Sequence, residues 1–152
     1  EVDPLPTSLE QRSLLEEYEA REGSLAILAC RPGDHEIRGT LTLASGRSRR
    51  TEHTAELSMG VGNAWWGRGI GALLMGAGLT WASRSNILRR VSLSVFQDNE
   101  VARRLYEKVG FATEGVLRRY VRWEAPASGV TTSVPQRYED LVVMGLWLGG
   151  ER

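Results

Sequence analysis

The chain has 152 residues with 19 basic and 19 acidic side chains, so its formal net charge is zero. That balance argues against a protein that binds nucleic acid or a membrane surface through overall charge. Hydrophobic residues make up 41% of the chain, as in a soluble globular domain, and the single cysteine excludes a disulfide within the chain. No apolar run approaches the ~20 residues of a membrane helix, and we expect a cytoplasmic protein.

The hydrophobic pattern predicts one helix and then three strands before the middle of the chain. The helix is expected over 7–22, because Gly23 suits a helix C-terminus. Cys30 ends an apolar run, and we expect its thiol in the core. The three strands are expected at 25–30, 37–45 and 51–62.

Helices and strands alternate in the second half. A helix is expected over 69–84 and another in NEVARRLYEKVG, residues 99–110, with Val101, Leu105 and Val109 directed inward. Polar residues at 124–136 indicate a loop. Further strands are expected at 89–96, 111–123 and 138–148.

This order of elements predicts an α/β fold. Short connections among the first three strands imply antiparallel pairing, whereas the helix at 69–84 crosses over between two strands that must then be parallel. We therefore expect a mixed, mostly antiparallel sheet with one parallel pair, flanked by helices. No linker is long enough to separate two domains, so a single domain over 1–152 is expected.

The stretch NAWWGRGIGALLM, residues 63–75, places three glycines at the start of a helix. Helix N-termini present N–H groups and a positive dipole end to anions, and glycine lets the backbone approach closely. A Walker A loop is excluded because it needs Gly-Lys-Ser/Thr. Gly67, Gly69 and Ala72 have the spacing of a Rossmann turn, but NAWW separates them from the strand and no acidic residue stands at the expected distance.

A coenzyme A loop is the third candidate, and it rests on a resemblance. WGRGIG, residues 66–71, resembles the loop [Arg/Gln]-x-x-Gly-x-[Gly/Ala] of the GNAT superfamily of acetyl-CoA-dependent N-acetyltransferases, with Trp66 in place of Arg or Gln. Residues 94–120 match a second motif of that family. Residues 138–148 are similar to the last strand of its ribosomal-protein alanine and polyamine N-acetyltransferase branch. The family begins with a further strand and helix, which we expect to be absent from this chain.

The resemblance implies a parallel strand pair that splays apart and binds the coenzyme between its strands. Met59, Gly60 and Val61 would offer free N–H and C=O groups to the pantetheine amides, like an added strand, and the Val61 N–H would polarise the thioester carbonyl. Alternatively, the glycines here only mark a bulge. The residues of the turn expected at the diphosphate are Trp66, Gly67, Arg68, Gly69, Ile70, Gly71 and Ala72.

Three further residues receive roles. The resemblance implies that Tyr106 is the general acid that protonates the departing thiolate, and the alternative is a packing tyrosine. Asn99 suits a helix N-cap, and the resemblance adds a contact with the coenzyme arm. Glu56, on the polar side of its strand, is expected to accept the amine proton through water, or else to be a surface residue. The two histidines lack the spacing of a metal site.

The sequence therefore predicts an N-acetyltransferase that moves an acetyl group from acetyl-CoA, as cosubstrate, to a primary amine by direct attack in a ternary complex. The acceptor is expected to be a small molecule or a peptide N-terminus, and a homodimer is common among the resembling proteins. Two alternatives stay open: a non-catalytic acyl-CoA-binding module of the same fold, and an NAD(P)-binding oxidoreductase.

Overall fold

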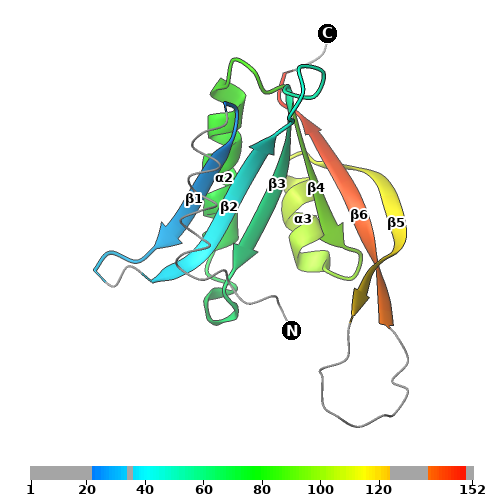
Figure 1. The fold of residues 1–152 in the computed structure, drawn as a ribbon. Helices are drawn as coiled ribbons and strands as arrows, with labels where there is room; N and C mark the ends of the chain where they lie inside the picture. The colour runs from blue at the N-terminus through cyan, green and yellow to red at the C-terminus, as the bar shows by residue number, and fades with distance from the viewer. Residues whose placement is uncertain (1–21, 34–35, 124–136, 150–152) are drawn as a thin grey trace, which may run out of the picture. The chain divides into compact units, whose positions relative to one another are not determined.

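The computed structural model describes residues 22–33, 36–123 and 137–149. The helix expected over 7–22 and the loop over 124–136 lie almost entirely outside the described residues. A 3-10 turn, η1 (Asn63–Trp65), precedes the first described helix. The strands and α-helices are β1 (Leu25–Cys30), β2 (Ile37–Ser45), β3 (Thr54–Val61), α2 (Ile70–Arg84), β4 (Arg90–Phe96), α3 (Glu100–Lys108), β5 (Ala112–Trp123) and β6 (Arg137–Trp147) (Figure 1).

The predicted elements agree with the structure to within a few residues. β1 and β2 have the predicted bounds, whereas β3 begins at Thr54 instead of residue 51. The chain turns at that point, since Thr51 accepts hydrogen bonds from the Thr54 N–H at 2.9 Å and from the Thr54 hydroxyl at 2.8 Å. Local turn bonds therefore replace the first three positions of the predicted strand.

The strands form one mixed sheet in the order β1-β2-β3-β4-β6-β5, with one parallel pair. The pairs β1–β2, β2–β3 and β5–β6 are antiparallel. The predicted fold class, a mostly antiparallel mixed sheet flanked by helices, is confirmed. The splay of the parallel pair and the single-domain organisation stay predictions.

The described residues fall into two compact units, one of residues up to Val91 together with 147–149, and one of residues 92–146. In the first unit α2 packs against β1, β2 and β3. Gly78 makes this packing close, because a Cβ at that position would lie 2.8 Å from Leu41 Cδ2. The core of this unit is formed by Leu41, Leu43, Ala55, Leu57, Leu74, Met75, Ala82, Leu88 and Val91.

The second unit contains α3 and the β5–β6 hairpin. The inward face of α3 differs from the prediction: Val101 is 84% exposed, whereas Tyr106 is buried and only 7% exposed. The Tyr106 and Phe111 rings pack with centroids 6.0 Å apart, so the tyrosine takes the core position that Val101 was predicted to share. The other buried apolar residues here are Leu93, Val95, Phe111, Val142 and Met144.

Candidate functional site

The glycine-rich turn before α2 has the geometry of an anion site. Gly67 and Gly69 have φ of 71° and 79°, in the left-handed region that favours glycine. A Cβ at either position would meet no atom within 4 Å, so a side chain would have room there. The positive φ, and not crowding, is therefore the reason that glycine stands at both positions. Gly69 is the N-cap of α2, where no side chain caps the helix and no acidic residue stands in the first turn.

Three of the predicted diphosphate-binding residues, Ile70, Gly71 and Ala72, stand in the first turn of α2. The first helical hydrogen bond runs from the Leu73 N–H to the Gly69 carbonyl at 3.0 Å. The N–H groups of Ile70, Gly71 and Ala72 precede that bond and point out of the positive end of the helix. This part of the predicted site is therefore a helix N-terminus able to receive an anion.

Two guanidinium groups lie against the ring of Trp65, just before the turn. Arg38, from β2, stands 3.7 Å from the ring centroid, and Arg68, from the turn, stands 4.7 Å from it. Glu36 lies 3.7 Å from Arg38. The side-chain role of Arg38 was not predicted, because its partner Trp65 is 27 positions away and no local pattern links them. The indole therefore holds the guanidinium of Arg68, the residue that precedes Gly69 at the N-cap of α2.

Trp66 stands where the resembling loop carries Arg or Gln. Its side chain is 63% exposed, and its Nε1–H donates to the Val61 carbonyl oxygen at 2.7 Å. This bond joins the turn to the end of β3. Two neighbouring tryptophans thus have separate partners: Trp65 contacts two arginines, and Trp66 contacts the main chain of β3.

The ladder between β2 and β3 shows where the main-chain groups of β3 point. The Gly62 N–H donates to the Arg38 carbonyl at 2.9 Å, so Gly62 and Arg38 form a hydrogen-bonded pair of the ladder. Bonded and non-bonded pairs alternate along an antiparallel ladder. Two residues earlier, Gly60 stands opposite Thr40, so the N–H and C=O of Gly60 are directed at β2. The prediction that Gly60 offers free groups to a pantetheine arm is therefore wrong.

Met59 and Val61 have the opposite orientation. They stand in the non-bonded pairs of the ladder, and their N–H and C=O groups point away from β2. Trp66 already occupies the Val61 carbonyl. The N–H and C=O groups of Met59 and Val61 are therefore directed away from β2, and of these the Val61 carbonyl already accepts from Trp66.

Glu56 is exposed on β3, opposite Ala44, while the adjacent Ala55 and Leu57 are buried. This alternation confirms the predicted polar side of the strand. The carboxylate is open to solvent, as a proton acceptor acting through water requires.

In the second unit, α3 carries the other two predicted residues. The Asn99 Oδ1 accepts a hydrogen bond from the Ala102 N–H at 3.1 Å, so Asn99 is the N-cap of α3. Burial raises the pKa of the Tyr106 phenol above its ordinary value. The phenol is therefore protonated at neutral pH, the state required of a proton donor.

A bulge in β5 was not predicted from the sequence. Three residues, 118–120, stand opposite Asp140 alone in the β5–β6 ladder. The Asp140 carboxylate accepts from the Arg119 N–H at 2.7 Å and from Arg118 Nη1 at 2.7 Å. These donors hold the pKa of Asp140 below its ordinary value. Asp140 also lines a polar cavity of about 350 Å³ with Gln97, Asp98, Arg137, Tyr138 and Glu139.

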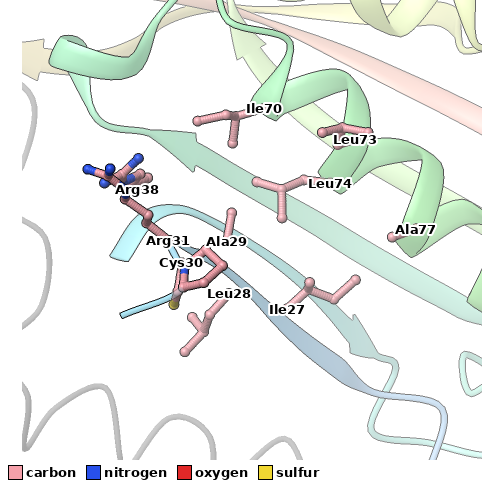
Figure 2. Close-up of a pocket in the computed structure, with 11 residues that line it drawn as sticks. Ile27, Leu28, Ala29, Cys30, Arg31, Arg38, Ile70, Leu73, Leu74 and Ala77 are labelled. Atoms are coloured by element: carbon pink, nitrogen blue, oxygen red, sulfur yellow. The ribbon is translucent and has the colours of Figure 1, made fainter. Parts of the chain in front are cut away.

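A larger pocket of about 460 Å³ lies between β1 and α2 (Figure 2). Arg31 and Arg38 lie at one end, and Ile27 and Ala77 lie at the other. Cys30 lines this pocket and is exposed, which corrects the prediction of a core thiol. β1 is an edge strand of the sheet, and Leu28, two positions before Cys30, is exposed as well. Of the predicted coenzyme-binding residues, Ile70 also borders the pocket.

The residues that the structure describes contain neither a cluster of metal ligands nor a membrane-spanning helix. Among these residues, no group of three or more His, Cys, Asp and Glu side chains is placed to hold a metal ion. Within the same part of the chain, no helix has the length and apolar character needed to cross a membrane.

Known proteins resemble this chain in sequence. The model of the acetyltransferase (GNAT) family matches residues 2–111. The L-amino acid N-acetyltransferase AaaT of Escherichia coli (strain K12) is 32% identical over 100 residues, which cover 66% of this chain and 60% of that protein. The match thus spans less than two thirds of the length of that curated relative.

Solved structures share the fold. The acetyltransferase of the GNAT family from Streptococcus pneumoniae matches with a TM-score of 0.80 at 29% identity, covering 96% of this chain and 79% of its own. The structure of yncA, a putative acetyltransferase from Salmonella typhimurium with its cofactor acetyl-CoA, has a TM-score of 0.77 at 19% identity. That match covers 98% of this chain and 78% of the other.

Proposed function

Since the chain belongs to the acetyltransferase (GNAT) family, we propose that it transfers an acetyl group from acetyl-CoA to a primary amine by direct attack within a ternary complex. The observation that carries this proposal is the left-handed turn at Gly67 and Gly69, which opens α2 without a capping side chain. The acetyl-CoA bound by yncA supports the choice of coenzyme.

The turn fits a diphosphate on three counts. Its glycines leave open space where a side chain would stand, the first turn of α2 carries no acidic residue, and Arg68 adds a positive charge. A diphosphate would accept hydrogen bonds from the N–H groups of Ile70, Gly71 and Ala72, and the helix dipole would favour its negative charge.

The end of β3 would hold the pantetheine arm and the reacting thioester. The main chain of Met59 points away from β2 and can pair with an extended amide chain as an added strand does. The Val61 N–H would donate to the thioester carbonyl oxygen as negative charge develops there, which lowers the barrier to attack. Acetyl-CoA itself supplies an activated acyl group and a thiolate leaving group.

Proton transfer is assigned to two side chains. Tyr106 would give its phenolic proton to the departing thiolate, since a phenol is protonated at neutral pH. Asn99, at the start of the same helix, is assigned to the coenzyme arm. Glu56, exposed on β3, would take the amine proton through water.

We propose an acceptor with an α-amino group, either an L-amino acid or a peptide N-terminus. An α-amino group has a pKa of about 7.7–8.0 and is partly neutral at pH 7, whereas a lysine-type amine near 10.4 is almost fully charged. An amine that is already partly neutral needs less help from a base, which suits a site where Glu56 acts only through water. The similarity to an L-amino acid N-acetyltransferase supports the same class.

Two measurements test this function. Thermal shifts with acetyl-CoA, CoA, NAD and ATP should show stabilisation by the first two, because only ligands that prefer the folded state raise its melting temperature. Free-thiol release should then identify the acceptor among L-amino acids, ribosomal-protein N-terminal peptides and polyamines. Binding of acetyl-CoA without thiol release would indicate a non-catalytic module, and stabilisation by NAD alone would indicate an oxidoreductase.

A further inference from the structure

The peptide group between Val61 and Gly62 is held from both of its sides. Its carbonyl oxygen accepts from Trp66 Nε1–H at 2.7 Å, and its N–H donates to the Arg38 carbonyl at 2.9 Å. The two groups of a trans peptide point in opposite directions. One bond therefore ties this peptide to β2, and the other ties it to the turn before α2.

This restraint acts at a point where the backbone is otherwise permissive. Val61 lies between Gly60 and Gly62, and a residue without a Cβ has access to a wider range of φ and ψ. The peptide before Val61 is tied to β2 through Gly60 and Thr40 by the alternation of the ladder. Trp66 supplies the restraint on the side of Val61 that faces away from β2.

We propose that Trp66 is a positioning residue, whose indole N–H fixes the Val61–Gly62 peptide and thereby directs the Val61 N–H at the thioester carbonyl. This inference rests on the proposed function, in which the Val61 N–H is the oxyanion donor. The value of such a donor depends on its being oriented before the reaction begins. Without the Trp66 bond only the ladder with β2 holds the two peptides on either side of Val61, so the Val61 N–H is oriented less firmly.

The same bond limits how a pantetheine arm pairs with β3. The Val61 carbonyl already accepts from Trp66, so an amide N–H of the arm would have to share that oxygen with the indole. The arm therefore pairs with the main chain of Met59, which leaves the Val61 N–H for the thioester carbonyl.

Trp66→Phe tests the role, because it keeps an aromatic ring and removes the N–H donor. Trp147→Phe is the matched control, since Trp147 is also an exposed tryptophan, at 54%, and lies outside the site. Trp66→Gln retains an N–H donor on a shorter side chain. The two readouts are the ¹³C shift of the Val61 carbonyl in the protein without ligand, and kcat and KM for acetyl-CoA by thiol release with the best acceptor amine.

Trp66→Phe should shift the Val61 carbonyl resonance and lower kcat on the order of tenfold, with KM for acetyl-CoA within about twofold of wild type. Trp66→Gln should recover part of kcat, and Trp147→Phe should leave both readouts unchanged. An unchanged carbonyl shift in Trp66→Phe, an unchanged kcat, or a rise in KM without a fall in kcat would each overturn the positioning role.

Different outcomes of these experiments contradict the proposed function and the role of Trp66. If the wild-type protein binds no acetyl-CoA, or releases no thiol with any amine, the acetyltransferase assignment is lost and the positioning role with it. The carbonyl shift would still decide whether Trp66 holds Val61 in solution. If the wild type is active and Trp66→Phe is equally active, the proposed function stands and the role of Trp66 does not.

Discussion

Asp140 holds Arg119 in a backbone conformation that a side-chain-bearing residue rarely adopts. Arg119 has φ of 52°, and its N–H donates to Asp140 Oδ1 at 2.7 Å. The same carboxylate binds Arg118 Nη1 at 2.7 Å. One acidic side chain on β6 thus organises the bulge of β5, and Tyr120, also in the bulge, is 66% exposed.

Replacement of Arg119 by glycine and by valine should have different effects on stability. The left-handed conformation costs a side-chain-bearing residue roughly 1–2 kcal/mol, and glycine adopts it freely at an entropic cost of about 0.5–1 kcal/mol. Arg119→Gly should therefore lie within about 1 kcal/mol of wild type in urea unfolding, and Arg119→Val should be clearly less stable than Arg119→Gly. Equal stability of the two variants would show that the bulge adopts another conformation in solution.

The Asp140 carboxylate should make the stability of the folded protein depend on pH in the acid range. The Arg119 N–H and the Arg118 guanidinium lower the pKa of Asp140 in the folded protein. The stability that the ionised carboxylate contributes is therefore present above the unfolded pKa of 3.8, and it is lost as pH falls through the pKa of the folded protein. The melting temperature of wild type should fall more than that of Asp140→Asn between pH 5 and pH 3, because the asparagine does not titrate. Parallel curves for the two proteins would contradict the pairing.

Replacement of three glycines in and next to α2 by alanine should change the free energy of unfolding in different ways. Gly76 lies in the helix with open space around it, and Gly76→Ala should stabilise by about 0.5–1 kcal/mol. Gly78→Ala should destabilise by about 1–3 kcal/mol, because the new methyl group meets Leu41 at 2.8 Å. Gly69→Ala should destabilise by roughly 1–2 kcal/mol through its φ of 79°.

The affinity for acetyl-CoA should distinguish Gly69, which stands at the proposed diphosphate site, from Gly76 within the helix. Gly69→Ala should weaken acetyl-CoA binding in calorimetry, since the new methyl group stands at the proposed diphosphate site. Gly76→Ala should bind like wild type. If Gly69→Ala bound acetyl-CoA normally, the diphosphate would lie elsewhere.

Tyr106→Phe should lower turnover and leave the fold intact. Phenylalanine can still pack against Phe111, whose ring centroid is 6.0 Å from that of Tyr106, but it has no proton to donate. We expect kcat to fall on the order of 10²-fold while the Kd for acetyl-CoA stays within about twofold. Full turnover of the variant across the pH range would contradict the assignment of Tyr106 as general acid.

Trp65→Leu should loosen Arg68 and weaken coenzyme binding. The indole contacts Arg38 and Arg68, and an exposed cation–π contact such as that of Arg68 contributes about 0.5–1 kcal/mol. We therefore expect the Kd for CoA to rise by about two- to fivefold, and the effect to shrink in Arg68→Ala, where the shared partner is already gone. Fully additive effects of the two substitutions in calorimetry would contradict the coupling.

The sequence by itself predicted the elements whose pattern is local. Apolar runs and turns between them predicted the bounds of β1 and β2, and the glycine spacing before Ile70 predicted the helix start with its left-handed glycines. These features depend on residues close together in the chain, because periodicity and backbone freedom are local properties.

The tertiary structure decided which groups of the site meet. The contacts of Trp65 with Arg38, of Trp66 with the Val61 carbonyl, and of Asp140 with Arg119 each join different elements. Register and bulges set these contacts, and a shift of one residue reverses every side chain and main-chain group of a strand. Packing of the whole unit likewise buried Tyr106 in preference to Val101 on α3, although helical spacing favoured the valine.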